Sequence, residues 1–188
     1  MIELLTVMSI LAVVIVVVAP GIGTQLRNAQ IRNAADAMMA GLQRARAEAI
    51  RRNERVRFSM VSTLSDTCVL SPTAGSWIVS VDDPAGNCDS PAGDATAPRI
   101  IAVHTASDGN AAAEVVATQA DGTASSAIIF NAFGRPIDGS QLARMVFSSS
   151  INPGENRSYR VEVSPSGGVR MCDTQVSITS DDPRRCTS

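Results

Sequence analysis

The sequence has few of the residues from which enzymes and metal sites are usually built. His104 is its only histidine, its four cysteines form no Cys-x-x-Cys pair, and aromatic residues make up 3% of the chain. Zinc sites usually consist of closely spaced cysteine and histidine ligands, so this composition argues against a metal. Neither a Gly-Lys-Ser/Thr phosphate loop nor support for a Ser-His-Asp triad is found. We therefore expect no catalytic residue, no metal and no cofactor.

Lysine is also missing, so all sixteen basic residues are arginines, and we assign no function to that bias. The net charge of −2 conceals a division of the chain. Residues 1–57 carry eight arginines against four acids, whereas the rest carries eight arginines against fourteen acids. Six arginines crowd residues 44–57, but no aromatic platform for nucleic-acid bases accompanies them. A solvated helix face beside acidic neighbours is the better interpretation.

The sequence does contain an even number of cysteines, namely Cys68, Cys88, Cys172 and Cys186. In a chain that also has a long apolar segment, this favours disulfides in an exported domain. Four cysteines allow three connectivities, of which the pairing of sequence neighbours is the simplest. Each bridge of that kind would close a loop of roughly 15–20 residues and contribute ~3 kcal/mol on the loop-entropy model.

The first 23 residues, MIELLTVMSILAVVIVVVAPGIG, form a nearly unbroken apolar run. Residues 4–19 carry no charge; alone they are shorter than the ~20 residues that span a bilayer, but a helix continuing through residue 23 would be long enough. A cleavable signal peptide would begin with basic residues and end at a small-x-small site. A half-exposed core helix would not be apolar on every side, as residues 13–18 are. The segment therefore predicts a membrane-spanning helix.

Glu3 is the only charged residue in this run. An unpaired carboxylate in hydrocarbon costs on the order of 3 kcal/mol, so such a group is a functional candidate. It could pair with the free α-amine of its own chain or of an adjacent subunit, which would set the axial register of packed helices. It could also reach water near a membrane face, and the residues alone leave both interpretations open.

The charges that flank the run conflict with the cysteines. Arg27 and Arg32 follow it, so the positive-inside rule would place the C-terminal domain in the cytoplasm, whereas the cysteines favour an oxidising compartment. A basic leader that precedes residue 1 would reconcile the two.

The segment MIELLTVMSILAVVIVVVAP resembles the N-terminus of type IV pilins and type II secretion pseudopilins. Residues 2–5 match the acidic centre of the family motif, and Pro20 stands where the family has its helix-melting proline. The resemblance implies that Glu3 serves prepilin processing and docking to the preceding subunit, and that Pro20 marks a segment able to unwind on assembly. The glycine, aromatic residue and threonine that precede the motif in the family are missing here. The resemblance therefore implies that the upstream reading frame encodes a short basic leader ending in glycine.

Four further patches are similar to the minor-pilin branch called the GspH/FimT family, in that family's order: residues 34–58, 75–83, 128–136 and 164–172. They are spread over most of the chain. The resemblance implies an α+β, pilin-like fold in which a long N-terminal helix with a protruding hydrophobic half packs on a C-terminal antiparallel β-sheet domain. We expect a membrane or filament-core segment at 1–23, the amphipathic half of the helix at 24–55, and a periplasmic β domain with two disulfides at 56–188.

The residues themselves predict the same elements. An apolar stripe at alternating steps of four and three predicts a helix over 25–52, and one helix over 2–52 would be ~75 Å long, so that half of it would protrude. The stripe is Ile31, Ala35, Met38, Leu42, Ala45 and Ala49. Period-two patterns then predict seven antiparallel strands within residues 55–61, 76–82, 98–104, 126–132, 144–150, 158–164 and 167–173.

The C-terminal hairpin bears on a possible role in DNA uptake. Members of the family with that role carry a Gly-Arg-x-Arg motif there; in this chain Arg170 matches the second arginine, and Gly168 replaces the first. Arg184 and Arg185 could compensate if a disulfide brings them near, but two aspartates precede them. One arginine in an acidic domain holds phosphate poorly.

The resemblance implies a structural protein, a minor pilin that primes or caps a type IV pilus. It would be anchored by a single pass in the inner membrane, with its C-terminal domain in the periplasm, before it joins the cell-surface pilus. The implied partners are other minor pilins, the major pilin, the prepilin peptidase that also N-methylates, and the inner-membrane assembly platform. A pilus-borne DNA receptor and a minor pseudopilin of type II secretion are the alternatives.

Overall fold

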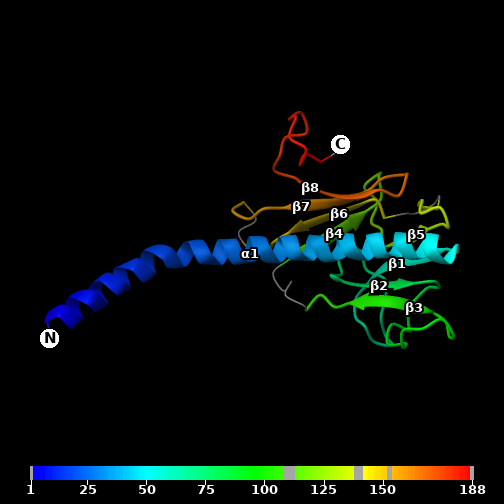
Figure 1. The fold of residues 1–188 in the computed structure, drawn as a ribbon, viewed down its shortest axis with the longest axis horizontal. Helices are drawn as coiled ribbons and strands as arrows, with labels where there is room; N and C mark the ends of the chain where they lie inside the picture. The colour runs from blue at the N-terminus through cyan, green and yellow to red at the C-terminus, as the bar shows by residue number, and fades with distance from the viewer. Residues whose placement is uncertain (1, 108–112, 138–141, 152–153, 187–188) are drawn as a thin grey trace.

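The computed structural model describes residues 2–107, 113–137, 142–151 and 154–186, apart from the side chains of residues 2, 5 and 15–22. In this part of the chain one helix is followed by eight strands (Figure 1). The elements are α1 Ile2–Arg52, β1 Val56–Val61, β2 Ser76–Ser80, β3 Ile100–His104, β4 Glu114–Thr118, β5 Ala127–Phe130, β6 Arg144–Ser148, β7 Tyr159–Val163 and β8 Val169–Asp173. The predicted α+β class is confirmed.

Helix α1 has two different halves. Its N-terminal part projects beyond the strands and curves away from them, whereas its C-terminal half lies along them (Figure 1). The predicted apolar stripe faces the strands, and none of its members is more than 1% exposed: Ile31, Ala35, Met38, Leu42, Ala45 and Ala49. Burial of the three large side chains in that stripe contributes roughly 5–9 kcal/mol.

The helix ends at Arg52 because the next residue takes a left-handed backbone conformation. Asn53 has a φ of 54°, and asparagine tolerates this region better than most residues. The N–H groups of Asn53 and Glu54 then donate to the carbonyls of Ile50 and Ala49, which satisfies two acceptors of the last turn. The chain is thereby turned back along α1 as strand β1.

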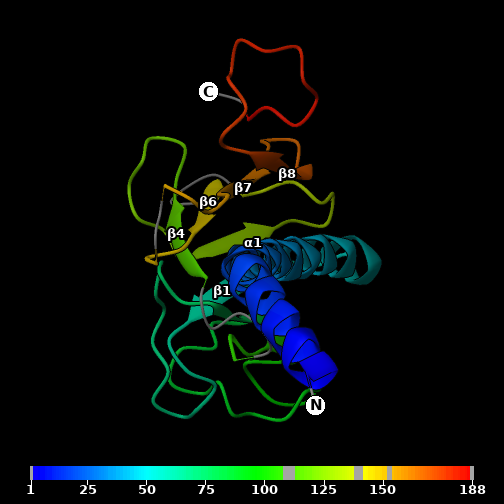
Figure 2. The same cartoon turned by 90° about the vertical axis from the view of Figure 1, so that its left-hand side faces the viewer.

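The strands form two four-stranded antiparallel sheets, in the orders β3-β2-β1-β5 and β4-β6-β7-β8. Helix α1 contacts strands of both sheets, and Figure 2 shows it with its N-terminal part toward the viewer. Side chains on the inner faces of both sheets join the stripe of α1 in one core, among them Phe58, Phe130, Met145, Phe147 and Val161. One helix therefore holds two sheets together.

The seven predicted strands are present, and β4 is a strand that the sequence pattern did not predict. Its side chains do alternate, because Val115 and Ala117 are 5% and 0% exposed whereas Val116 between them is 52% exposed. Only one bulky residue on this short strand faces the core, and small and polar residues flank it on both sides. Its pairing with β6, which completes the second sheet, depends on residues some thirty positions away.

Two disulfides join sequence neighbours, Cys68 to Cys88 and Cys172 to Cys186. The first lies in a second apolar cluster with Val61, Ile78 and Ile100. Met60 belongs to the main core and its neighbour Val61 to this cluster, so the cluster lies on the face of the first sheet that is turned away from α1. The second disulfide ties the C-terminal segment to β8.

Gly41 allows α1 to approach the first sheet closely. A Cβ atom at this position would lie 2.8 Å from a ring atom of Phe58 and 2.9 Å from ring atoms of Trp77. The two rings contact each other with their centroids 5.6 Å apart, and both belong to the core. Neither ring can move away from a Cβ at position 41 without displacing the other ring.

We expect Gly41→Val to lower the free energy of unfolding by about 2 kcal/mol or more, since it overpacks the contact between helix and sheet. The matched control is Ala40→Val, at an exposed position of the same helix, where only a helix-propensity difference of about 0.5 kcal/mol is expected. Urea denaturation of the full chain in detergent measures both. Equal destabilisation by the two variants would contradict this account of the packing.

Candidate functional site

The N-terminal half of α1 carries apolar side chains that the rest of the chain does not cover. Seven of them are between 51% and 69% exposed: Leu4, Val7, Met8, Ile10, Leu11, Val13 and Val14. They lie on all sides of the helix, since their spacing does not follow a single face. Soluble monomers rarely expose a contiguous apolar surface of this kind, which marks a site of contact with protein or lipid.

Glu3 lies in the first turn of α1 and is exposed. A carboxylate here is favoured by the positive end of the helix dipole. Among the described residues no arginine lies within ion-pair distance of it. The nearby hydroxyls are engaged locally instead, because Thr6 Oγ1 donates to the carbonyl of Glu3 and Ser9 Oγ to that of Thr6, each at 2.8 Å. The carboxylate is thus left available at the tip of the projecting segment.

Pro20 lies inside α1, within the projecting part. Proline has no N–H group, so the helix lacks one backbone hydrogen bond at this point. Among the residues that the structure describes, no helix contains a stretch long and apolar enough to cross a membrane. The anchoring predicted for residues 1–23 stays a prediction.

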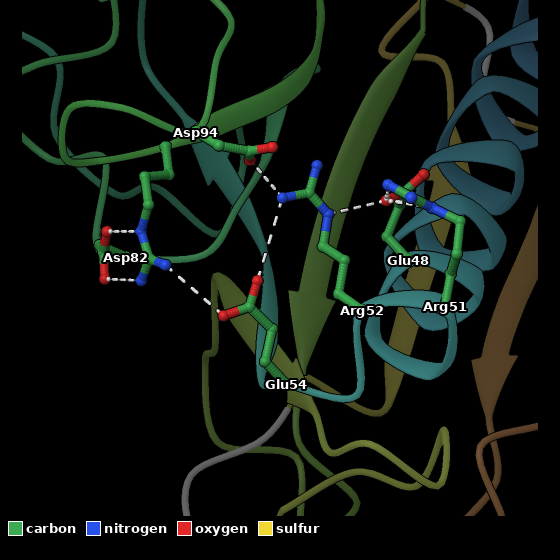
Figure 3. A network of polar contacts seen from close by, with 7 residues as sticks. Glu48, Arg51, Arg52, Glu54, Asp82 and Asp94 are labelled. Atoms are coloured by element: carbon green, nitrogen blue, oxygen red, sulfur yellow. Dashed lines mark hydrogen bonds and ion pairs between the residues drawn. The ribbon is translucent and has the colours of Figure 1, made fainter.

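At its other end α1 is fixed by a network of ion pairs, which Figure 3 shows. Glu48 accepts hydrogen bonds from Arg51 at 2.6 Å and from Arg52 at 2.9 Å. The hydrogen bond from Arg51 and, to a smaller extent, the one from Arg52 lower the pKa of Glu48. Arg52 also binds Asp94, in the connection between β2 and β3, and lies 3.9 Å from Glu54. The end of the helix is thereby joined to a loop far along the chain.

Arg99 extends this network from Glu54 to Asp82. Its Nε and Nη2 donate to the two carboxylate oxygens of Asp82 at 2.8 and 2.9 Å, and its Nη1 lies 3.5 Å from Glu54. This paired contact lowers the pKa of the Asp82 carboxyl. The loop between Cys88 and Arg99 is thus held at Asp94, which binds Arg52 of α1, and at Arg99, which binds Asp82 and Glu54.

The three arginines proposed for DNA contact do not come together. Arg170, at the start of β8, donates twice to one oxygen of Glu162, at 2.8 and 3.0 Å. Arg184 lies at the opposite end, where its carbonyl accepts from the N–H of Asp173. Arg185 donates to backbone carbonyls in its own loop.

The charges of Arg170 and Arg184 are compensated within the chain. Glu162 is only 7% exposed and also lies 3.3 Å from Arg160. Arg184 binds Asp182 at 2.7 Å, and its hydrogen bonds hold the pKa of Asp182 at about 2. A phosphate would have to displace these carboxylates, which lowers the gain from each contact.

One group of residues has the composition of a metal site. Glu162, Cys172 and Cys186 are buried, and their ligand atoms lie within 4.8 Å of one another. The two sulfur atoms are bonded to each other, however, and Glu162 is paired with Arg170. Cysteine binds a metal as the thiolate, and a disulfide contains none, so this arrangement offers no sulfur ligand.

Antiparallel sheets packed on a long helix, with an uncovered apolar half and an acid at its tip, define a pilin-like protein. A family model described as "Type II transport protein GspH" matches residues 34–167. That match covers more than half of the chain, and the protein belongs to the GspH family. The resemblance that the sequence indicated is confirmed.

Two crystal structures of the type IV minor pilin FimU from Pseudomonas aeruginosa (strain PAO1) are similar to this chain. The one in space group P65 is 14% identical with a TM-score of 0.46, and the match covers 74% of this chain and 90% of that one. The one in space group P21 is 18% identical with a TM-score of 0.44, covering 75% and 87%. The comparison with curated proteins finds no match.

Acid should weaken the ion pairs that Glu48 forms with Arg51 and Arg52 and that Asp82 forms with Arg99. The folded-state pKa values of Asp82 and Glu48 are lowered, so their stabilisation is complete above their ordinary values of 3.8 and 4.5. It is lost as the pH falls through the lower folded values. We expect Asp82→Asn to reduce the fall in stability below pH 4, whereas the same change at the exposed Asp89 leaves it unaltered. Unfolding midpoints measured from pH 2 to 6 test this, and indistinguishable profiles would count against it.

We also expect weak binding of duplex DNA, with a dissociation constant above about 10 µM at 150 mM salt, because Arg170 and Arg184 are already paired with carboxylates. A gel-shift titration of residues 24–188 measures this, with Arg170→Ala changing the affinity by less than twofold. Submicromolar binding that falls steeply with salt and is lost in Arg170→Ala would contradict the expectation.

Proposed function

We propose that this protein is a structural subunit of a type IV pilus, a minor pilin that primes or caps the filament. The observation that carries the proposal is the uncovered apolar half of α1 with Glu3 at its tip. A helix of this kind gains stability only when other helices or lipid surround it. Family membership supports the coarser statement, that the protein works within a pilus or pseudopilus together with other pilins.

The driving force for incorporation would be burial of the seven exposed side chains between residues 4 and 14. Fully burying an aliphatic side chain stabilises by about 1.5–3 kcal/mol, and these are roughly 60% exposed at the start. Even half of that gain over seven residues amounts to roughly 5–10 kcal/mol. This is enough to hold a subunit among neighbouring helices once its entropic costs are met.

Glu3 would select the register of that packing. Apolar contacts are non-directional, so a helix could slide along its neighbours with little change in energy. A carboxylate that pairs with the α-amine of an adjacent subunit favours one axial position, because every other position leaves both charges without a partner in an apolar surrounding. Pro20 would allow the helix to open locally during insertion, since one hydrogen bond is already missing there.

Before assembly, the same apolar half would hold the protein in the inner membrane by a single pass, with the disulfide-bonded domain in the periplasm. The two disulfides support the oxidising compartment. The partners would be other minor pilins, the major pilin, the prepilin peptidase and the assembly platform. We propose a structural and not a catalytic role.

The test replaces the acid and follows incorporation. We expect Glu3→Ala to remain in the membrane fraction but to decrease at least tenfold in sheared filaments, measured by immunoblot of both fractions. The matched control is Asp36→Ala, which removes a carboxylate from the same helix at a half-exposed position. Normal amounts of Glu3→Ala in the filaments would refute the role of this acid.

A further inference from the structure

The end of the molecule opposite the N-terminus presents an aromatic side chain to solvent. Phe133, in the turn after β5, is 82% exposed. The turn lies at the C-terminal end of α1, since Arg46 Nε donates to the carbonyl of Gly134 at 3.1 Å, and β5 reaches that end in Figure 1. Ile50 of α1 is 49% exposed beside it, and a Cβ on Gly134 would lie 2.7 Å from its Cδ1.

Phe133 is held in place by a rigid turn. The side-chain oxygen of Asn131 accepts the N–H groups of Phe133 at 2.9 Å and of Arg135 at 3.1 Å. The backbone of Asn131 also accepts from Gly134 and donates to Arg135. A side chain displayed on a fixed turn loses little entropy when it binds, so the arrangement suits recognition.

The turn between β7 and β8 packs against the turn that carries Phe133. Gly167, between β7 and β8, has a φ of 83°, and a Cβ there would lie 1.8 Å from the carbonyl oxygen of Gly134. The position therefore excludes any side chain. Gly134 itself has a φ of 70°, which favours glycine. Two turns from distant parts of the sequence together fix the display of Phe133.

A hollow of about 460 Å³ lies next to the turn. Its apolar lining includes Pro136, Ile137, Leu142, Val163 and Pro165, and Asp121 lies at its polar side. A cavity of about 150 Å³ already holds a benzene ring, so this hollow can accept a phenylalanine side chain. One end of the protein thus carries both an aromatic projection and a place that fits one.

The charges at this end are complementary in the same way. Arg135 is exposed on the turn, and Asp121 is exposed at the hollow, where its carboxylate accepts the N–H of Thr123 at 2.9 Å. Within the described residues neither has an ion-pair partner. A surface with one cation and one acid in separate places can pair with itself when a two-fold axis passes between them.

We propose that this end is an isologous contact between two copies of the chain. Each Phe133 enters the hollow of the other copy, and each Arg135 meets the other copy's Asp121. The contact lies away from the projecting half of α1, so both N-terminal segments remain available for packing. The inference does not depend on the filament proposal, because pairing of the purified chain is expected even when Glu3 is replaced.

The first experiment locates the contact. The full chain in detergent micelles carries photoreactive benzoylphenylalanine in place of Phe133 and is irradiated. We expect a covalent dimer whose crosslink, mapped by mass spectrometry, falls on residues lining the hollow, such as Ile137 or Val163. Crosslinks confined to other surfaces, or no dimer, would overturn the proposal.

The second experiment separates this contact from any association through α1. Sedimentation equilibrium in density-matched detergent should show dimerisation weakened at least tenfold by Phe133→Ser, with unchanged affinity in the control Val116→Ser, which is also exposed. Arg135→Glu and Asp121→Arg should each weaken it, and the double variant should restore it. Since these side chains are exposed, unfolding midpoints should not change. Failure of the double variant to regain affinity, or equal dimerisation in all variants, would disprove the pairing.

Discussion

The packing of one helix against two sheets is the contact on which the rest of the structure depends. The sheets share no strand, and their inner side chains meet in a core whose third wall is the buried stripe of α1. Gly41 brings the helix close enough for Phe58 and Trp77 to pack on its backbone. Because the sheets hold only the C-terminal half of α1, the N-terminal half projects beyond them as a continuation of the same helix.

Ion pairs and disulfides act on the periphery of this core. Ion pairs of Arg52 with Asp94 and of Arg99 with Glu54 connect the end of α1 to the segment between β2 and β3, which has little apolar surface of its own. The disulfide between Cys68 and Cys88 closes a second cluster on the far side of the first sheet. Surface ion pairs are individually weak, but this network closes a loop already shortened by a covalent bond. The ion pairs therefore only have to fix the position of a loop whose conformations the disulfide already restricts.

The sequence predicted those features that depend on neighbouring residues. The stripe of α1 and seven strands follow from spacing, because a period of 3.6 or 2 is visible within one segment. The sequence pattern did not predict β4 because Val115 is the one large side chain on its core face. Likewise, the pairing of Arg170 with Glu162 and the buried state of that acid depend on two strands lying side by side. Phe133 lies in the family-like patch at residues 128–136, and only the fold shows that it is exposed.

The two ends of the molecule offer contacts of different physical kinds. The N-terminal end has a large apolar surface on a helix, whose contacts are non-directional and need Glu3 to fix their register. The opposite end has one aromatic side chain on a turn held by Asn131 and by two glycines, where shape itself supplies the direction. Contacts at one end leave the other exposed, since α1 separates them. A subunit of this form can therefore be held in a bundle of helices at one end while its other end binds a neighbour.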